Sequence, residues 1–262
     1  MMPPKQVGQA VSPADSEVGQ ALSSANLDID LLRRTHPQRV IDYHVTIDST
    51  MRLAAGRTVG TVIIADEQTA GQGRHGHSWH SERGSGIYVS IVLSPAPLLT
   101  LALGLAAAEA ITTATGIACD LRWPNDVLVD GRKVAGILTQ LADSVAVGGI
   151  GINVNHTAFP AELAGQATSL RMHAGSEFSR FEILAALIPA VESFAEMDRE
   201  TILRLFQQAS SYTAGRRVVV EQPEGMVVGV TAGLTNEGYL VVRKDDGTDT
   251  LIIAGGVRAA GA

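Results

Sequence analysis

The residues with the clearest chemical potential lie in a glycine-rich segment, residues 71–79. Gly71, Gly73 and Gly76 would let backbone N–H groups turn toward an anion, because no Cβ atom obstructs the approach. Arg74 adds a permanent positive charge between these glycines. This composition is typical of a loop that covers a phosphorylated ligand.

The glycine spacing also matches G-x-G-x-x-G, the fingerprint of dinucleotide-binding proteins. That fingerprint opens a helix whose N-terminus holds the pyrophosphate, and an acidic residue follows about 20 positions later. Here the glycines lead instead to Gly84 and Gly86 and then to the strand-like run 87–93. A loop followed by a strand argues against a dinucleotide-binding site.

Three further segments place unusual residues between apolar runs. In residues 122–126 a Trp-Pro pair precedes Asn125 and Asp126, whose oxygens suit Mg²⁺, although an isolated Asn-Asp pair more often forms an Asx turn. Lys133 begins an apolar stretch, where it could also simply charge a strand edge. Glycines within the run 148–155 mark either a bulge or the close approach of a ligand.

The elements that position these residues are predicted from hydrophobic periodicity. Ser49 and Thr50 form an N-cap cluster before a short helix at 51–55, and hydroxyls at such a turn can cap the helix or face a ligand. Asp130-Gly131 between two apolar runs predicts a hairpin. The predicted strands are 40–47, 59–65, 87–93, 117–123, 127–129, 134–141 and 145–155. The predicted helices are a short one near 26–32, then 98–115, 180–197 with a kink at Pro189, and 199–210. Residues 157–175 are predicted to form a loop.

The order of these elements predicts an α+β fold, with a mixed, largely antiparallel sheet and packed helices. Four or five short strands after residue 212 predict a small C-terminal SH3-like β-barrel. We therefore divide the chain into a disordered tail at 1–25, a catalytic domain at 26–212 and a C-terminal domain at 213–262.

Composition limits the classes of partner. The net charge of −7 argues against a general nucleic-acid surface, and no apolar run reaches the length of a membrane span. The single cysteine, Cys119, excludes an internal disulfide and fits a reducing cytosol; its apolar surroundings indicate inert packing. The N-terminus lacks a basic-then-apolar signal pattern. We expect a cytoplasmic protein without membrane or nucleic-acid partners.

The glycine-rich segment and the three further segments, taken in their order along the chain, resemble the motifs of the biotin–protein ligases. The resemblance covers about residues 40 to 258 and implies a class II aminoacyl-tRNA synthetase-like catalytic domain. About 35 residues precede the first predicted strand, too few for a DNA-binding helix-turn-helix domain, so a monofunctional type is expected. The matching motifs are residues 71–74 with Trp79, 122–126, 133–138 and 149–153, and residues 48–50 fall at the family's Ser-Thr pair.

The resemblance implies a reaction in two steps. Biotin and Mg·ATP would form biotinyl-5′-AMP and pyrophosphate. A lysine of a biotin carboxyl carrier domain, from an acyl-CoA or pyruvate carboxylase, would then attack the mixed anhydride and release AMP. Biotin and ATP are thus the expected substrates, with Mg²⁺ as the metal.

The resemblance also implies the site residues. Lys133 would bridge the biotin carboxylate and the α-phosphate, Arg74 would hold the phosphate and retain the adenylate, and Asp126 would serve Mg²⁺ and orient or deprotonate the incoming lysine. The residues implied for biotin are Ser49, Thr50, Gln68, Gly71, Gln72, Gly136, Gly149 and Gly151, together with Arg74 and Lys133. Those implied for ATP are Gly73, Asn125, Asn153 and Trp79, the last near the adenine.

The sequence departs from the family pattern at several of these positions. Because Gln72 carries no charge, adenylate retention is expected to depend mainly on Arg74. His75 and His77 are expected to be exposed loop residues. Gln72, His75 and His77 stand where arginine is common, Met51 replaces the usual Asn, and Arg122 replaces the usual Lys while keeping the charge.

Two other functions remain to be weighed. A lipoate–protein ligase would have the same fold, but its Arg-Arg-x-x-Gly-Gly-Gly type loop is absent and the Trp-Pro-Asn-Asp turn argues against it. The other is a biotin-binding regulatory protein: a biotin-responsive repressor is disfavoured by the short N-terminal tail and the acidic charge balance, and a catalytically inactive biotin-binding module by the presence of Lys133, Arg74 and Asp126. Strand edges in this fold can pair between subunits, so a homodimer stays open.

Overall fold

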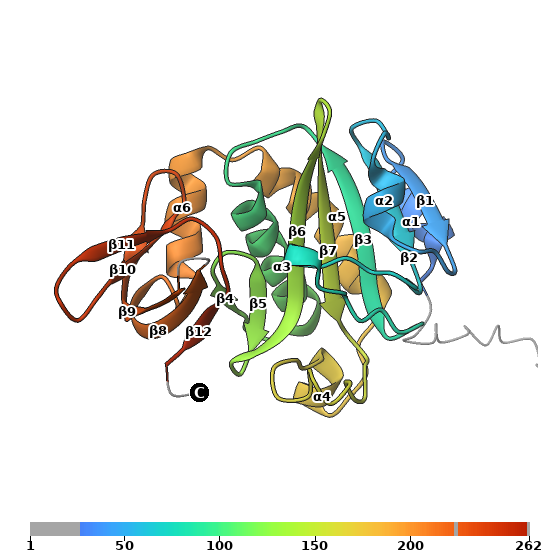
Figure 1. Ribbon diagram of the computed structural model, residues 1–262. Coiled ribbons are helices and arrows are strands. Elements are labelled where there is room, and N and C mark those ends of the chain that lie inside the picture. The colour runs from blue at the N-terminus through green and yellow to red at the C-terminus, as the bar shows by residue number, and fades with distance from the viewer. Residues whose placement is uncertain (1–26, 223–224, 261–262) are drawn as a thin grey trace, which may run out of the picture.

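The computed structural model describes residues 27–222 and 225–260 (Figure 1). The α+β class predicted from the sequence is confirmed, with helices packed against largely antiparallel sheets. The predicted tail at 1–25 lies outside the described residues. The helices are α1 (Ile29–Thr35), α2 (Thr50–Ala54), η1 (Arg74–Gly76), α3 (Leu99–Thr115), α4 (Leu170–Ala174), α5 (Arg180–Ala195) and α6 (Arg199–Gln208).

A seven-stranded sheet forms the centre of the molecule, in the order β1-β2-β3-β7-β6-β5-β4. β1 and β2 pair in parallel and every other neighbouring pair in this sheet is antiparallel. Its β-branched and apolar strands are buried because elements cover both faces at the centre. The strands are β1 (Val40–His44), β2 (Thr61–Ala65), β3 (Gly86–Leu93), β4 (Asp120–Arg122), β5 (Asp126–Val129), β6 (Arg132–Ala142) and β7 (Val145–Asn153).

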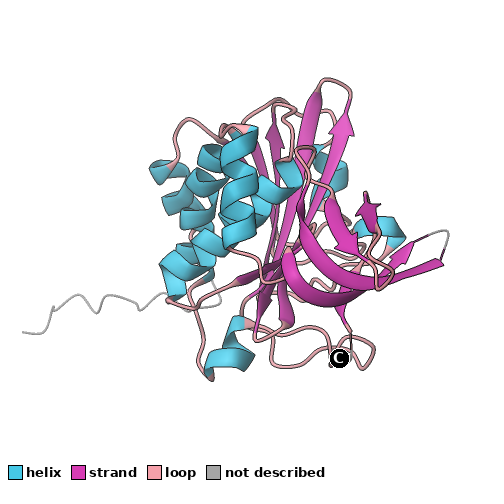
Figure 2. Ribbon diagram, turned by 90° about the vertical axis from the view of Figure 1, so that its left-hand side faces the viewer, coloured by secondary structure: helices cyan, strands magenta, loops and turns pink. Residues whose placement is uncertain are grey.

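Most of the helices lie on one side of this sheet (Figure 2). α3 is apolar around most of its circumference because it lies between the sheet and α5, and Gly116 ends it with a φ of 74°. Within the described residues, no helix has the length and apolarity needed to cross a bilayer.

A second, five-stranded antiparallel sheet follows α6, in the order β11-β10-β9-β8-β12. The indole N–H of Trp123, in the turn after β4, donates to the carbonyl of Gly238 at 2.9 Å and ties the two sheets together. The proposed domain boundary near residue 212 falls between α6 and β8. The strands of this sheet are β8 (Ala214–Gln222), β9 (Gly225–Leu234), β10 (Leu240–Arg243), β11 (Asp249–Ile252) and β12 (Val257–Ala259).

The structure corrects several predicted elements. The predicted loop at 157–175 contains α4, which begins where the Ser169 side chain accepts from the N–H of Met172 and ends before Gly175. One helical turn and a half is too short to give a periodic signal. The predicted strands at 40–47 and 117–123 shorten to β1 and β4, because the pairing with the neighbouring strand is not continuous beyond them; Ile47 makes only an isolated parallel bridge to Gln68.

Candidate functional site

A pocket opens on the face of the central sheet that points away from α3. The alternation of side chains along β7 sets this arrangement. A Cβ atom at Gly148 would meet Leu103 of α3, whereas one at Gly149 would lie 2.5 Å from Sδ of Met51, on α2. The predicted residues that line the pocket are Thr50, Gln68, Gln72, Gly73, Arg74, Trp79, Asn125, Lys133, Gly136, Gly149 and Gly151.

The floor of the pocket is made of two glycines that pair directly across β6 and β7, Gly136 and Gly151. The indole of Trp79 lies on this bare patch of backbone. A Cβ atom at Gly136 would come within 2.7 Å of Cζ3 of the indole, and one at Gly151 within 2.7 Å of Cζ2 and closer still to Nε1. Within the described part of the chain, the buried indole N–H has no hydrogen-bond partner. Trp79 therefore covers the glycines that the resemblance assigns to biotin.

Lys133 lies above the same floor. Its Nζ is 5.2 Å from the centre of the Trp79 ring, and its Cε would be 2.8 Å from a Cβ atom at Gly136. A register shift between β5 and β6 lies next to Lys133 and redirects the strand there. The backbone of Lys133 is held by the loop before α4, donating to the carbonyl of Gln166 at 2.8 Å and accepting from Thr168 N–H at 2.9 Å.

Asp126 holds Lys133 from the neighbouring strand. Its Oδ1 is 2.5 Å from Nζ of Lys133, and its Oδ2 accepts from Nη2 of Arg122 at 2.7 Å. Burial tends to raise the pKa of the Asp126 carboxyl, but the charges and hydrogen bonds of Lys133 and Arg122 outweigh burial and lower the pKa below its ordinary value. The carboxylate is therefore ionised and shared between two cations.

The glycine-rich segment folds over the pocket as a tight hairpin. Gln72 and Ser78 form an antiparallel bridge, and the N–H of Gly73 donates to the carbonyl of His77 at 2.7 Å. The turn places His75 at a φ of 54°, a conformation that few non-glycine residues adopt. His75 and His77 are exposed, as expected.

Arg74 fixes this hairpin to the turn after β4. Its Nη1 donates to Oδ1 of Asn125 at 2.9 Å, and Asn125 in turn donates through Nδ2 to the carbonyl of Ile137 at 3.1 Å. Burial lowers the pKa of the Arg74 guanidinium, while the nearby Asp126 charge opposes that effect. The two segments that the sequence singled out, 71–79 and 122–126, thus meet through one charged hydrogen bond.

A chain of hydroxyl and amide groups closes the other side of the pocket. Ser90 donates to Thr50 Oγ1 at 2.8 Å, and Thr50 donates through both its backbone N–H and its hydroxyl to Oε1 of Gln68. The amide of Gln68 donates to Ser81 Oγ at 2.9 Å, and Ser81 donates to the carbonyl of Trp79 at 3.2 Å. These contacts orient Thr50 and Gln68 and hold the end of the hairpin.

Four predicted residues lie outside the lining. Ser49 is the N-cap residue of α2, yet its buried hydroxyl makes no capping bond. Gly71 is buried, where a Cβ atom would meet the Trp79 carbonyl and the Ser81 hydroxyl. Asn153 is buried and donates to the carbonyl of Thr168 at 3.1 Å. Asp126 acts on the pocket through Lys133.

Several lining residues were not singled out from the sequence as site residues. They are apolar or aromatic side chains, and the signal that could have found them is alternation along the strands that carry the motifs. Met51, which occupies the space beside Gly149, was identified only as a departure from the family pattern. The others are Tyr88, Val89, Ile137, Leu138 and Ile150.

The chain is similar to known proteins of one family. Residues 39–155 match the sequence model of the biotin/lipoate A/B protein ligase family. The chain is 34% identical over 223 residues to the biotin–[acetyl-CoA-carboxylase] ligase of Mycobacterium tuberculosis, covering 80% of this chain and 82% of that protein. It is 32% identical to the bifunctional ligase/repressor BirA of Bacillus subtilis, covering 86% of this chain and 76% of that protein.

Solved structures give the same result. The biotin protein ligase of Aquifex aeolicus in complex with biotin and ATP superposes with a TM-score of 0.75 and 29% sequence identity. The match covers 84% of this chain and 99% of that one.

Proposed function

Because the chain belongs to the biotin protein ligases of the biotin/lipoate A/B protein ligase family, we propose that it joins biotin to a carrier protein by way of biotinyl-5′-AMP. The observation that carries this mechanism is the charge of the pocket. Among its lining residues Arg74 and Lys133 carry formal charges, both positive, and no lining residue is a carboxylate. A neutral ring system on the glycine floor, with a carboxylate and a phosphate at the two cations, fits this lining.

In the first step, an oxygen of the biotin carboxylate attacks the α-phosphorus of ATP. The bond from that phosphorus to the bridging oxygen breaks, and pyrophosphate leaves. Two anions must approach each other, so the reaction needs fixed positive charge and alignment rather than a protein nucleophile. We assign Lys133 to the position between carboxylate and α-phosphate, and Arg74 to the phosphate from the hairpin side.

Magnesium enters this scheme as part of the Mg·ATP substrate. The pair predicted to hold it, Asn125 and Asp126, has its side-chain oxygens directed at cationic side chains. Arg74 occupies Oδ1 of Asn125, while Lys133 and Arg122 occupy the two carboxylate oxygens of Asp126. As Asp126 lies in this structure, its carboxylate is engaged by Lys133 and Arg122 and does not fit the predicted magnesium site.

In the second step, the amine of a carrier lysine attacks the acyl carbon of the adenylate. The bond between that carbon and the phosphate oxygen breaks, AMP leaves, and the nitrogen releases a proton. Asp126 is a weak base, because its pKa is lowered by Lys133 and Arg122. Its role in the proposal is to orient Lys133 rather than to accept the proton.

The position of Trp79 gives the proposal a conformational step. A ring system that binds on Gly136 and Gly151 must displace the indole that now covers them. The hairpin that carries Trp79 is attached to the rest of the structure through Arg74 and Ser81. It would open as one unit when the ligand enters and then close over it as a lid. Closure would exclude water from the anhydride.

The experiment that tests the function is ATP–pyrophosphate exchange, run in parallel with biotin and with lipoate. We expect exchange with biotin, followed by labelling of one lysine in a biotin carboxyl carrier domain from an acyl-CoA or pyruvate carboxylase. Exchange with lipoate alone would overturn the proposal.

A pair of lysine variants tests the assigned chemistry. Lys133→Met should abolish adenylate formation in a single turnover, because the bridging charge is lost. Lys244→Met removes a lysine from the turn between β10 and β11, where Lys244 is partly exposed beside Asp246, and should retain exchange. Unchanged adenylate yield in Lys133→Met would show that the role of Lys133 is wrong while leaving the overall reaction in place.

A further inference from the structure

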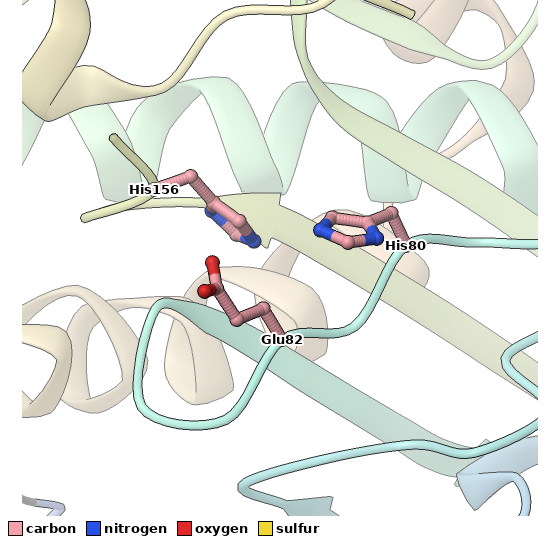
Figure 3. Close-up of side chains that lie close together, drawn as sticks. All are labelled: His80, Glu82 and His156. Atoms are coloured by element: carbon pink, nitrogen blue, oxygen red, sulfur yellow. The ribbon is translucent and has the colours of Figure 1, made fainter. Parts of the chain in front are cut away.

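Two histidines and a glutamate converge next to the pocket, on residues that the proposed reaction does not use. His80 and Glu82 lie on the segment between η1 and β3, and His156 lies just after β7, so the cluster joins segments more than 70 residues apart. Figure 3 shows the carboxylate of Glu82 and the ring of His80 directed toward the imidazole of His156. One possible ligand atom from each residue lies within 4.8 Å of the other two.

The hydrogen bonds around His156 fix which ring nitrogen is free. The hydroxyl of Tyr88 donates its proton to the carbonyl of Glu82 at 2.8 Å. The same hydroxyl is 3.2 Å from Nε2 of His156, so it can only accept there, and Nε2 must carry the proton. The Nδ1 atom is then left with a lone pair. It is buried and has no hydrogen-bond partner among the residues that the structure describes, and His156 as a whole is 0% exposed.

An unpartnered lone pair in the protein interior is costly unless it receives a donor or a cation. A histidine that donates through one nitrogen and offers the other is the usual state of a metal ligand, since the donated hydrogen bond fixes the tautomer and the ring orientation. For His156, the hydroxyl of Tyr88 accepts this hydrogen bond from Nε2–H.

The donor set is selective for one class of ion. Two imidazole nitrogens and one carboxylate oxygen suit Zn²⁺ and related divalent transition metals, whereas Mg²⁺ and Ca²⁺ prefer sites made of oxygen. Tetrahedral bonds of about 2.0–2.2 Å place ligand atoms about 3.4 Å apart. His156 is fixed, but Glu82 is exposed and His80 is half-buried, so these two side chains can close the remaining gap.

The surroundings of the cluster support a bound cation. Phe159 stacks on His156 with centroids 5.1 Å apart and meets His80 edge-on at 6.1 Å, which shields one side of the site from water. The nearby guanidinium of Arg180 is paired with Asp66 at 2.8 Å, so its charge is compensated.

We propose that His80, Glu82 and His156 bind one divalent transition-metal ion of the zinc class. The ion fastens the segment after the hairpin to the end of β7, because two ligands come from the former and one from the latter. None of the three ligands lines the pocket, so the proposal does not depend on the proposed reaction.

The test is direct measurement of metal binding by the full chain, with any affinity tag removed. Protein stripped with EDTA is dialysed against Zn²⁺ alone, and bound metal is measured by mass spectrometry and titration calorimetry. We expect one tightly bound zinc per chain, a rise in melting temperature with zinc, and no displacement by millimolar Mg²⁺. The absence of a stoichiometric zinc, or its displacement by Mg²⁺, overturns the proposal.

Variants identify the ligands. Glu82→Gln and His80→Asn change side chains that are not fully buried, so they should fold, and each should weaken zinc binding more than about tenfold. Tyr88→Phe leaves all three ligands but removes the acceptor for Nε2–H of His156, and should weaken binding by about 10- to 100-fold.

A matched control uses the histidine–carboxylate pair elsewhere on the surface, His173 and Asp130, whose atoms are 2.9 Å apart. His173→Gln should bind zinc as the wild type does. Zinc affinity that is unchanged in both Glu82→Gln and His80→Asn, or that is lost in His173→Gln, places the ion elsewhere and overturns the assignment. Melting temperatures measured without metal show whether each variant is folded.

Discussion

The contact between Trp79 and the glycine floor can be tested by adding a single methyl group at Gly151. In Gly151→Ala the new Cβ atom would lie 2.7 Å from Cζ2 of the indole and closer still to Nε1. An ordinary contact between such atoms is about 3.5–4.0 Å, so the indole has to move by about 1 Å or leave the floor. Overpacking of this kind costs about 1–3 kcal/mol. The covered state would therefore become about 5- to 150-fold less populated relative to an open one.

Tryptophan fluorescence measures this change because the chain has two tryptophans in different settings. Trp123 is buried and its indole donates to Gly238, so its emission should stay constant. We expect the emission of Gly151→Ala to shift to longer wavelength as Trp79 becomes exposed to water. Wild-type protein should show a smaller shift in the same direction when biotin displaces the indole.

Gly149→Ala is the matched control on the same strand and the same face. Its added Cβ atom meets Sδ of Met51 at 2.5 Å and not the indole, so Trp79 emission should match that of the wild type. If Gly151→Ala is folded and its emission equals that of Gly149→Ala, then Trp79 does not lie on Gly151 and the proposed displacement by ligand is wrong.

Three further predictions follow from the charges and burial described above. The pKa of Asp126 lies below its ordinary value of 3.8, so its pairing with Lys133 and Arg122 stabilises the fold above about pH 4 and is lost as pH falls through the lowered pKa. Asp126→Asn should lower the free energy of unfolding at pH 7 by no more than about 3–5 kcal/mol. In denaturant titrations at a series of pH values, the free energy of unfolding of this variant should fall less steeply toward acid pH than that of the wild type. Arg74→Gly should release adenylate, seen as biotin on lysines of non-carrier proteins; labelling confined to the carrier would place retention elsewhere in the hairpin. Burial raises the pKa of Cys119 to about 12, so its reaction with a disulfide reagent at pH 8 should be at least about 100-fold faster in denaturant than in the native protein.

Sequence periodicity predicted the elements that bury a continuous apolar face. The helix over 98–115 and the hairpin around Asp130-Gly131 agree with α3 and with β5–β6, because each has local signals for its start, period and end. α4 escaped prediction because five residues give no period, although Ser169 provides the N-cap.

The contacts within the pocket depend on chain segments far apart in sequence, and these were harder to predict. Sequence motifs identified Gly136 and Gly151 as ligand-facing, but not that they pair with each other or that Trp79 covers them. The bond between Arg74 and Asn125 spans 51 positions and leaves no local pattern. Such contacts follow from strand order, which spacing alone does not determine.

The histidine cluster shows the same limit. The sequence contains the spacing H-x-E at 80–82, but a third ligand 74 residues beyond Glu82 has no spacing that marks it as a partner. His156 becomes a candidate only because the Tyr88 hydroxyl accepts from Nε2–H, which leaves Nδ1 buried with no partner in residues 27–222 and 225–260.

The pocket and the histidine cluster share one short segment, and this constrains how the lid moves. Trp79 packs on Gly151, while the next residue, His80, meets the ring of His156 at 5.8 Å between centroids. A metal bound at His80 would hold that end of the segment in place. The indole must then leave the floor by movement on the other side, where Gly73 and Gly76 flank Arg74. The metal site and the biotin pocket would thus be occupied at the same time. The metal would confine the opening movement to the hairpin and keep the segment before β3 in place.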